Sequence, residues 1–373
     1  MSARLALALS PRHDALEEHA RSFAARAIAP REHEESDDFA RSVTKELGAE
    51  GLLEAGCDLE VTAVCLLREI VASHSGLVDS MLALQGLGYG PIALMGSDAQ
   101  RAEWRPRVAS GHAIAAIAIT EPEAGSDLGA IKTRARRDGP DWVIDGRKSF
   151  ITNAGLADLY CLFARTSDDG TRGLSAFIVP ADRIARSIRY ELVAPHPCGE
   201  IELEGARVPA DALIGGEGQG MKLAMMTLDR FRPTVGAAAI GMGQRALDEA
   251  VSRSNARSQF GQPIARFQQI GAYLADSFAE LEAARLLVYR AAAARDRDEH
   301  NAGMLASAAK LLATETAQRV IDRAVQVHGG TGVRRGSVVE RLYREIRALR
   351  VYEGTSEIQR VVLARALTQA RSG

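Results

Sequence analysis

The sequence predicts a mainly helical protein with a central β domain, because the residue pattern changes twice along the chain. Apolar residues recur at helical spacing through residues 10–111. Short β-branched and aromatic runs, separated by turn dipeptides, follow through residues 113–208, and long Ala-rich helical windows begin at residue 218. The expected layout is an N-terminal helical domain (1–112), a small antiparallel β-barrel or sandwich (113–215) and a C-terminal bundle of long helices (216–373).

The composition limits the class of protein. The chain has 46 basic and 48 acidic residues, and this near balance argues against a nucleic-acid-binding protein, which normally carries a basic excess. Hydrophobic residues make up 46% and charged residues 25% of the chain, which excludes disorder for most of it. The four cysteines form no C-x-x-C pair, so a zinc ribbon, a thioredoxin-type site and a disulfide scaffold are not expected.

No segment has the pattern of a targeting or membrane segment. The stretch Met1–Pro11 has too few apolar residues for a signal peptide. No window reaches the roughly 18 apolar residues that a membrane span requires. We therefore expect a cytoplasmic protein that binds neither membranes nor nucleic acid.

The N-terminal stretch predicts several helices. Ser10 and Pro11 provide an N-cap and a proline at the first helical position, and Pro30 is expected to end that first helix. The run Val61–Val71 lacks a polar face and is predicted to be buried. Further helices are expected at about residues 40–53, 59–74 and 77–95.

The middle stretch predicts strands joined by turns. The dipeptides Asp138-Gly139, Asp145-Gly146 and Asp169-Gly170 are typical of tight turns. The segment 201–204 alternates apolar and acidic residues, as a half-exposed strand does. These signals predict at least six strands with no helix between them.

The C-terminal stretch predicts long helices at about residues 219–230, 234–256, 264–296, 302–328, 336–346 and 356–370. The glycine-rich segment 215–220 precedes them. It is interpreted as a domain linker, because no strand–loop–helix unit with a downstream acidic residue surrounds it, as a phosphate-binding loop would require.

The familiar short catalytic motifs are missing. The chain has no G-x-x-x-x-G-K-[ST], no G-x-S-x-G and no H-E-x-x-H, and its eight histidines are dispersed. A P-loop nucleotidase, a hydrolase of the nucleophile-elbow type and a zinc peptidase are therefore not expected, and we expect no metal site.

Four other segments, taken in order, carry a resemblance. They are Ile119–Asp127 (ITEPEAGSD), Phe150–Asn153 (FITN), Arg257–Ile264 (RSQFGQPI) and Tyr352–Arg360 (YEGTSEIQR), with Gln326–Gly330 (QVHGG) between the last two. Together they resemble the acyl-CoA dehydrogenase family of flavoproteins. The resemblance covers nearly the whole chain and is strongest from about residue 96 to residue 367. It implies FAD-dependent α,β-dehydrogenation of an acyl thioester, in fatty acid metabolism.

The resemblance implies which residues hold FAD. Thr120 and Thr152 would bond the polar edge of the isoalloxazine ring, with Phe150 against the ring. Arg257 would reach the pyrophosphate of a neighbouring subunit's FAD, since a guanidinium matches phosphate oxygens bidentately. The complete implied set is Ile117, Ile119, Thr120, Gly125, Ser126, Phe150, Ile151, Thr152, Arg257, Gln259, Phe260, Gln268, Gln326, Val327, Gly329, Gly330, Thr355 and Glu357. Taken alone, the segment 150–153 also fits a buried strand entering a turn, and Arg257 also fits a residue at a helix C-terminus.

The resemblance implies that Glu353 is the catalytic base, which removes the substrate α-proton while the β-hydrogen leaves as hydride to flavin N5. Ser356 and Gln359 have the spacing of a capping box, so a helix is expected to begin there with Glu353 just outside it. By itself this pattern equally fits an ordinary glutamate at a helix N-terminus. Some branches of the family place the base just before the arginine of an L-D-x-x-R motif, where this chain has Phe231, which cannot take a proton.

The substrate contacts implied by the resemblance are Ser126, Asp229, Arg232, Glu353 and Gly354. One departure from the family lies at Ala194–Glu200, where a longer serine-containing segment is usual. The acyl group could therefore arrive on coenzyme A or on an acyl- or peptidyl-carrier protein. The sequence is also compatible with an oxygen-using acyl thioester oxidase and, least well, with a flavin-free helical scaffold.

The resemblance also implies two protein partners. An electron-transfer flavoprotein is the expected electron acceptor. If Arg257 reaches a neighbour's FAD, the chain must form at least a dimer, and the family suggests a homotetramer built as a dimer of dimers.

Overall fold

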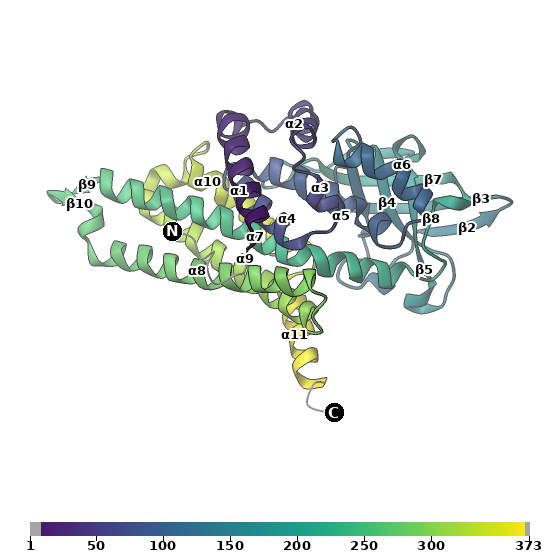
Figure 1. Ribbon diagram of the computed structural model, residues 1–373. Coiled ribbons are helices and arrows are strands. Elements are labelled where there is room, and N and C mark those ends of the chain that lie inside the picture. Colours follow the sequence, from purple (N-terminus) through teal and green to yellow (C-terminus); the bar gives the residue numbers. More distant parts are fainter. Residues whose placement is uncertain (1–8, 370–373) are drawn as a thin grey trace. The chain divides into compact units, whose positions relative to one another are not determined.

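The structure, a computed structural model, describes residues 9–369. Helices precede and follow a central β-sheet, which confirms the expected fold class (Figure 1). The chain forms two compact units. The first contains the chain up to His33, Val61–Asp79 and the chain from Asp229, and the second contains Glu34–Glu60 and Ser80–Leu228. No helix within residues 9–369 is long and apolar enough to cross a membrane.

The described helices of the first unit include most of the long predicted ones. Ser10 caps the first helix through a capping box with His13. The helical segment continues as a π-helix over Ala24–Ile28 and ends in a short 3-10 turn that contains Pro30, as predicted. Val61–Val71 lies in α4, where all but one of its residues are buried. The helices that lie wholly in this unit are α1 (Pro11–Phe23), α4 (Val61–Ala72), α8 (Gln268–Asp296), α9 (Ala302–His328), α10 (Val338–Leu349) and α11 (Ser356–Gln369). Helix α7 (Gly220–Ala256) belongs to it from Asp229 onward.

Helix α7 corrects one prediction. Two helices were expected, at 219–230 and 234–256. Pro233 lies between these windows, and a proline inside a helix removes a backbone donor at a cost of about 3 kcal/mol. The structure has one continuous helix of 37 residues with Pro233 inside it. The residues after the proline, including Val235 and Met242, are buried in the core between α7, α9 and α10, and this burial offsets the lost bond.

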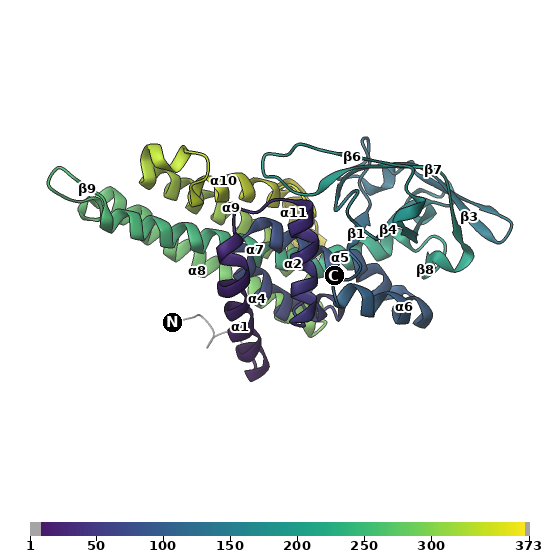
Figure 2. The same cartoon turned by 90° about the horizontal axis from the view of Figure 1, so that it is seen from above.

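Helices α8 and α9 lie side by side, and α10 and α11 pack on α9 (Figure 1). Between α7 and α8 the chain forms the short hairpin of β9 (Ser258–Gln259) and β10 (Gln262–Pro263), at the ends of these two helices (Figures 1 and 2). Helix α8 was expected from residue 264, but residues 264–266 form a 3-10 turn and the helix begins at Gln268.

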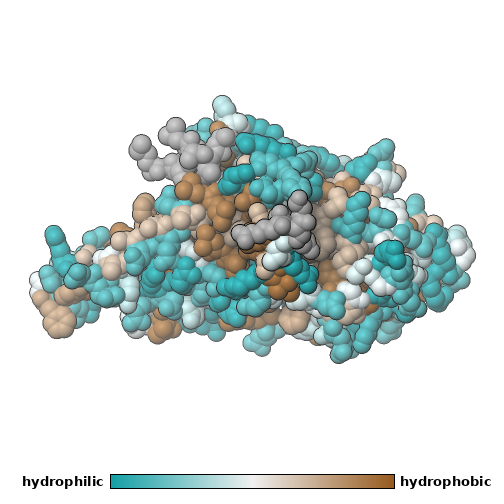
Figure 3. Space-filling view, turned by 90° about the horizontal axis from the view of Figure 1, so that it is seen from below, coloured by the Kyte–Doolittle hydropathy of each residue, from teal (hydrophilic) through white to brown (hydrophobic). Residues whose placement is uncertain are grey.

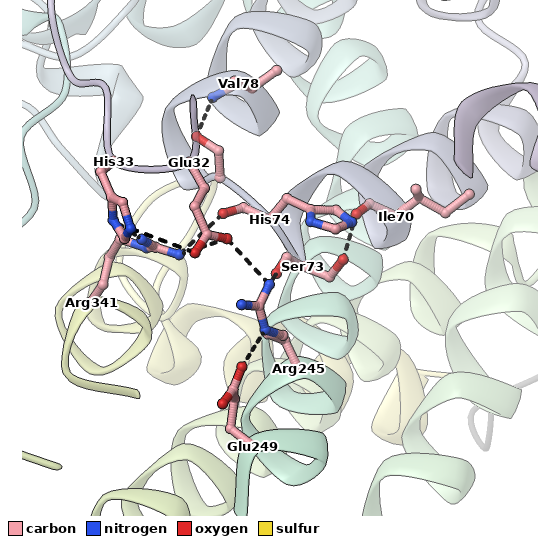
Figure 4. Close-up of polar contacts among 10 residues, drawn as sticks. Glu32, His33, Ile70, Ser73, His74, Val78, Arg245, Glu249 and Arg341 are labelled. Atoms are coloured by element: carbon pink, nitrogen blue, oxygen red, sulfur yellow. Dashed lines mark hydrogen bonds and ion pairs between the residues drawn. The ribbon is translucent and has the colours of Figure 1, made fainter. Parts of the chain in front are cut away.

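A half-buried carboxylate anchors the segment that follows α1. The carboxylate of Glu32 forms ion pairs with Arg245 of α7 at 3.3 Å and with Arg341 of α10 at 3.2 Å (Figure 4). Arg341 also bonds Nδ1 of His33 at 2.7 Å and the carbonyl of His74. Two guanidinium groups from different helices thus share one carboxylate inside the first unit.

The second unit contains the sheet and three short helices. The helices α2 (Asp37–Ala49), α3 (Glu54–Cys57) and α6 (Asp98–Ala109) lie wholly within it, and α5 spans Gly76–Met95. Helix α6 was not predicted separately, although its Ser97 and Gln100 form a capping box. Buried Gln85 of α5 bonds the carbonyls of Val108 and Ala113 and the amide of Ala115, and so ties this helix to the first strand.

The sheet has eight strands in the order β6-β7-β3-β2-β4-β5-β8, with β1 beside β4. Most neighbours are antiparallel, as predicted, but β4 pairs in parallel with β1 and with β2. The predicted alternation at 201–204 is present in β7. The strands are β1 (Ala115–Ala118), β2 (Arg134–Asp138), β3 (Asp141–Thr152), β4 (Leu159–Arg165), β5 (Leu174–Pro180), β6 (Arg186–Arg189), β7 (Cys198–Pro209) and β8 (Leu213–Ile214).

The three turn dipeptides have different outcomes. Asp138-Gly139 joins β2 to β3, and Asp169-Gly170 lies in the connection from β4 to β5, as predicted. The prediction for Asp145-Gly146 is wrong, because this dipeptide lies inside β3 at a shift of register against β7. Gly146 has φ +149°, and a Cβ there would lie 2.5 Å from Oγ1 of Thr133, so the bulge requires glycine.

Candidate active site

Strained backbone marks the predicted site segments. Among the described residues, positive φ angles at non-glycine positions occur at Leu59, Phe150, Asn153, Phe260, Asp298 and Glu353. Four of these six lie in segments that carry the family resemblance. Such conformations cost about 1–3 kcal/mol each and cluster at functional sites. The strain therefore supports a functional role for each of these segments.

In the second unit, the end of β3 directs Phe150 outward. The pairing of β3 with β7 shifts register between Lys148 and Ile151, and Phe150 lies in this bulge with φ +54°. Its side chain is 62% exposed and packs on the Tyr190 ring, with centroids 5.0 Å apart. A β-bulge commonly re-aims a side chain beside an active site. The interpretation of residues 150–153 as an ordinary buried strand does not fit Phe150.

A buried ion pair fixes the segment that follows β1 to the start of this bulge. Nζ of Lys148 lies 2.7 Å from Oε1 of Glu121 and donates to the carbonyl of Ile119 at 3.0 Å. The carboxylate of Glu121 also accepts the amides of Lys132 and Thr133. Burial lowers the pKa of Lys148 to about 8, and Glu121 opposes this, so the ammonium persists at neutral pH. Backbone groups thus bond both members of the pair and hold it in place.

The other predicted cofactor residues of this unit gather around the same two segments. The amide of Ser149 donates to the carbonyl of Thr120 at 2.9 Å, which brings the first motif beside the second. Thr120 and Thr152 are half-buried, whereas Gly125 and Ser126 are exposed. The remaining three, Ile117 in β1, Ile119 after it and Ile151 in β3, are half-buried or buried.

In the first unit, Glu353 lies on a tightly held loop between α10 and α11. Glu353 has φ +53° and Gly354 has φ +91°. The carbonyl of Glu353 accepts from Nε of Arg232 at 3.4 Å and from Nε2 of Gln359 at 3.3 Å. Its side chain is half-buried, and its Oε2 is buried without a hydrogen-bond partner. The backbone is thus fixed while one carboxylate oxygen is left unbonded.

The helix cap here differs from the prediction. The predicted capping box of Ser356 and Gln359 is wrong, because Thr355 caps α11 by accepting the amide of Ile358. Oγ of Ser356 donates instead to Glu315 at 2.6 Å, and Gln359 bonds the carbonyls of Glu353 and Gly354. The predicted position of Glu353, just outside the helix, is nevertheless as found.

The surroundings of Glu353 raise its basicity. Burial raises the pKa of Glu353, and Arg68, Lys310 and Arg232 oppose this by their positive charge. A raised carboxyl pKa brings the group closer to the pH at which a general base works best.

The nearby carboxylates are engaged elsewhere. Asp79 accepts two bonds from Arg68, at 2.8 and 2.7 Å. Oδ1 of Asp229 accepts a hydrogen bond from Nη1 of Arg232 at 2.6 Å. Phe231, at the alternative base position, is buried and apolar. Glu353 is therefore the carboxylate in this cluster with a buried oxygen that has no hydrogen-bond partner.

The structure brings the predicted substrate residues Asp229 and Arg232 together with Glu353 and Gly354. Arg232 is buried and bonds the Glu353 carbonyl, so its observed role is to hold the loop. Thr355 is half-buried at the start of α11, and Glu357 is exposed on its first turn.

The hairpin residues form a separate group. Arg257, Gln259, Phe260 and Gln268 are all exposed, at the ends of α7 and α8 and away from α11 (Figure 1). Phe260 is 95% exposed, and Figure 3 shows apolar surface at this tip, at the left end of the view.

The segment 326–330, which the resemblance includes among the FAD-binding residues, lies at the end of α9. Gly329 has φ +60°, and a Cβ at Gly329 or Gly330 would meet nothing within 4 Å. Gln326 is exposed, and Val327 is buried in the core. Open backbone at paired glycines suits close approach of a ligand.

These residues fit the implied cofactor. An exposed ring at a bulge, half-buried threonine hydroxyls, an exposed arginine and open glycine backbone match the aromatic, polar-edge, phosphate and adenosine parts of FAD. Sequence reasoning missed the buried charges Lys148, Arg68, Asp79 and Lys310, because an isolated charge in an apolar window looks like a solvent-facing residue.

Models of the three acyl-CoA dehydrogenase domains match nearly the whole chain. The N-terminal domain matches residues 10–112, the middle domain residues 116–205 and the C-terminal domain residues 218–368.

Relatives agree with these matches. The probable acyl-CoA dehydrogenase FadE25 of Mycobacterium tuberculosis is 37% identical over 373 residues, 96% of this chain and 96% of the relative. Butyryl-CoA dehydrogenase from Megasphaera elsdenii has a TM-score of 0.90 at 31% identity, over 96% of this chain and 99% of that one. A glutaryl-CoA dehydrogenase from Mycobacterium smegmatis in complex with FADH2 has a TM-score of 0.88 at 26% identity, over 97% and 95%.

Proposed function

The chain belongs to the acyl-CoA dehydrogenase family, and we propose that it removes the α- and β-hydrogens of an acyl-CoA thioester to give the trans-2-enoyl thioester. It is an oxidoreductase acting on acyl-CoA, with FAD as its cofactor. The observation that carries the finer proposal is Glu353, which has strained backbone, an unbonded buried oxygen and three cations around it.

In this proposal Glu353 takes the α-proton on its unbonded oxygen. Bound FAD supplies the acceptor for the β-hydrogen, which leaves as a hydride. The backbone amide of Glu353 would donate to the thioester oxygen and so stabilise the negative charge that develops as the α-proton leaves. The two electrons would pass to an electron-transfer flavoprotein.

The residues proposed to hold FAD are those named from the sequence. Phe150, Thr120 and Thr152 would contact the isoalloxazine ring, and Gly329 and Gly330 the adenosine half. Ser126, on the exposed end of the first motif, would face the phosphopantetheine arm. We also propose that the chain divides into domains 1–112, 113–215 and 216–373 and that the protein is cytoplasmic.

The carrier of the acyl group can be tested directly. The short segment Ala194–Glu200 supports a second candidate, a thioester on an acyl- or peptidyl-carrier protein, because this segment departs from the family pattern. If a carrier protein is the substrate, acyl-CoA should reduce the bound flavin much more slowly than the matched carrier-bound acyl group. The measurement is anaerobic flavin bleaching with a panel of both thioesters. Equal rates would remove the reason to invoke a carrier, and no bleaching by either would contradict dehydrogenation.

The assembly state is a further prediction. If Arg257 reaches the FAD of a neighbouring subunit, the exposed hairpin and Phe260 are covered in the oligomer. Light scattering of the FAD-loaded protein should then give about four times 39.9 kDa. A monomer with full FAD occupancy would contradict both the contact between subunits and the tetramer.

A further inference from the structure

Helix α9 carries a lysine whose ammonium is buried beside the catalytic loop. Lys310 is 1% exposed, inside an Ala-rich window. Its Nζ donates to the carbonyl of Leu349 at 3.1 Å and to the carbonyl of Gly354 at 2.7 Å. These two carbonyls stand on either side of Glu353 in the chain, so one side chain fixes both ends of the segment that carries the base.

A second residue of α9, Glu315, also bonds the loop between α10 and α11. Its carboxylate accepts hydrogen bonds from Nε of Arg350 at 3.0 Å and from Oγ of Ser356 at 2.6 Å. Gln359 bonds the carbonyls of Glu353 and Gly354 from α11. Because these contacts are independent of Lys310, the loop keeps several anchors when Lys310 is replaced.

The charges that face Glu353 come from four helices, and they are not equivalent. Arg68 of α4 is paired with Asp79 of α5 at 2.7 Å, and Arg232 of α7 is paired with Asp229 at 2.6 Å. Lys310 of α9 makes no ion pair with any carboxylate in the part of the chain that the structure describes. Of the charges around Lys310, Glu353 has the largest effect on it. Lys310 is therefore the cation of this cluster without a carboxylate partner, and its positive charge favours the ionised form of Glu353.

We propose that Lys310 is a positioning residue for Glu353, which fixes the loop through two carbonyls and keeps the carboxylate ionised without bonding to it. This inference rests on the proposed role of Glu353 as the base.

The arrangement solves a conflict between burial and basicity. A base in a buried site must stay ionised, yet a direct ion pair to its oxygens would make it a weaker base and block the substrate. Lys310 directs its donors to backbone carbonyls, so it supplies a positive field while Oε2 of Glu353 stays unbonded. Burial lowers the pKa of Lys310 to about 8, and Glu353 opposes this, so the ammonium is present at neutral pH.

Two replacements separate the charge from the hydrogen bonds. Lys310→Met removes both, and Lys310→Gln keeps an amide donor without the charge. Loss of the positive charge raises the pKa of Glu353, so flavin reduction by a turned-over acyl-CoA should require a higher pH. For both variants the acid limb of the rate–pH profile should move upward by about one pH unit, equal to about 1.4 kcal/mol. Lys310→Met should also lower the plateau rate, because the loop loses an anchor.

The measurement is anaerobic stopped-flow flavin reduction from about pH 5 to pH 9 on FAD-loaded proteins, with FAD content and unfolding temperature recorded first. Glu315→Gln is the control, since it removes the other hold on the loop but leaves the charge of Lys310. Glu315→Gln should lower the unfolding temperature and leave the acid limb of the rate–pH profile in place. If Lys310 has a merely structural role, the Lys310 variants should behave in the same way. If the limbs of both Lys310 variants overlay the wild type, the inference is wrong.

Glu353→Gln in the same series tests the premise. If Glu353→Gln reduces its flavin like the wild type, Glu353 is not the base and the premise fails; if the wild-type protein is not reduced by any acyl-CoA, the proposed function itself fails. If it is inactive while the Lys310 profiles are unshifted, only the role of Lys310 fails.

Discussion

Glu353→Gln is expected to slow flavin reduction by the acyl thioester by about 10⁴-fold, while FAD binding and folding are retained. Glutamine keeps the size and the hydrogen-bonding shape of the side chain but cannot accept the α-proton. Loss of a general base typically costs about 10²–10⁴-fold, and 10⁴-fold corresponds to about 5.4 kcal/mol of barrier.

The upper end of this range is expected because no neighbour can replace Glu353. Asp79 and Asp229 are each bonded to an arginine, and Phe231 is apolar. The measurement is anaerobic stopped-flow reduction at matched FAD content. Glu103→Gln is the matched control, since it makes the same chemical change at an exposed glutamate of α6, and its rate should equal that of the wild type. A rate within about tenfold of the wild type for Glu353→Gln would show that Glu353 is not the base.

Lys148→Met is expected to lower the free energy of unfolding by about 3–5 kcal/mol. The substitution leaves the carboxylate of Glu121 buried without its counter-charge, and breaking one partner of a buried pair has a cost of this size. It also removes the donor to the carbonyl of Ile119. The loss should be measured as a shift of the urea unfolding midpoint of the FAD-free protein at neutral pH.

Two further variants identify the cause. Adding Glu121→Gln to Lys148→Met should recover part of the loss, because the stranded charge is then neutral. Arg147→Met, one residue earlier, removes an exposed arginine that pairs with Glu200 at 3.4 Å, and it should cost less than about 1 kcal/mol. If Lys148→Met is no more destabilising than Arg147→Met, the buried pair does not stabilise this segment.

Local pattern was sufficient for most elements of the fold. The local pattern predicted α4, α5 and α9 to within a few residues, because α9 buries a regular apolar face and α4 and α5 are apolar runs that are buried almost all round. The same reasoning failed where distant contacts decide the outcome. Asp138-Gly139 and Asp145-Gly146 are the same dipeptide, yet the first is a turn and the second is a bulge that Thr133 and the pairing with β7 impose. A dipeptide carries no information on such partners.

For the candidate site, too, local features were predicted from the sequence and features that depend on distant contacts were not. The sequence placed Glu353 just before a helix, and the structure agrees. It assigned the cap to Ser356, but Glu315, 41 residues earlier in the chain, takes that hydroxyl, so Thr355 becomes the cap. Lys310 and Lys148 were missed for a related reason, since only the tertiary fold shows that an isolated lysine is buried and what its ammonium contacts.

The left-handed backbone at Phe150 and Glu353 limits which substitutions each position can accept, whatever the chemistry requires. An L-residue in this region costs about 1–2 kcal/mol, and β-branched residues fit it worst. In a saturation library, valine, isoleucine and threonine should therefore be lost from both positions through instability, before activity is screened. Asparagine, aspartate and glycine relieve the backbone, so they should survive as folded proteins. The survivors at position 353 would then include well-folded, inactive proteins, and selection for stability alone would drive the chain away from glutamate.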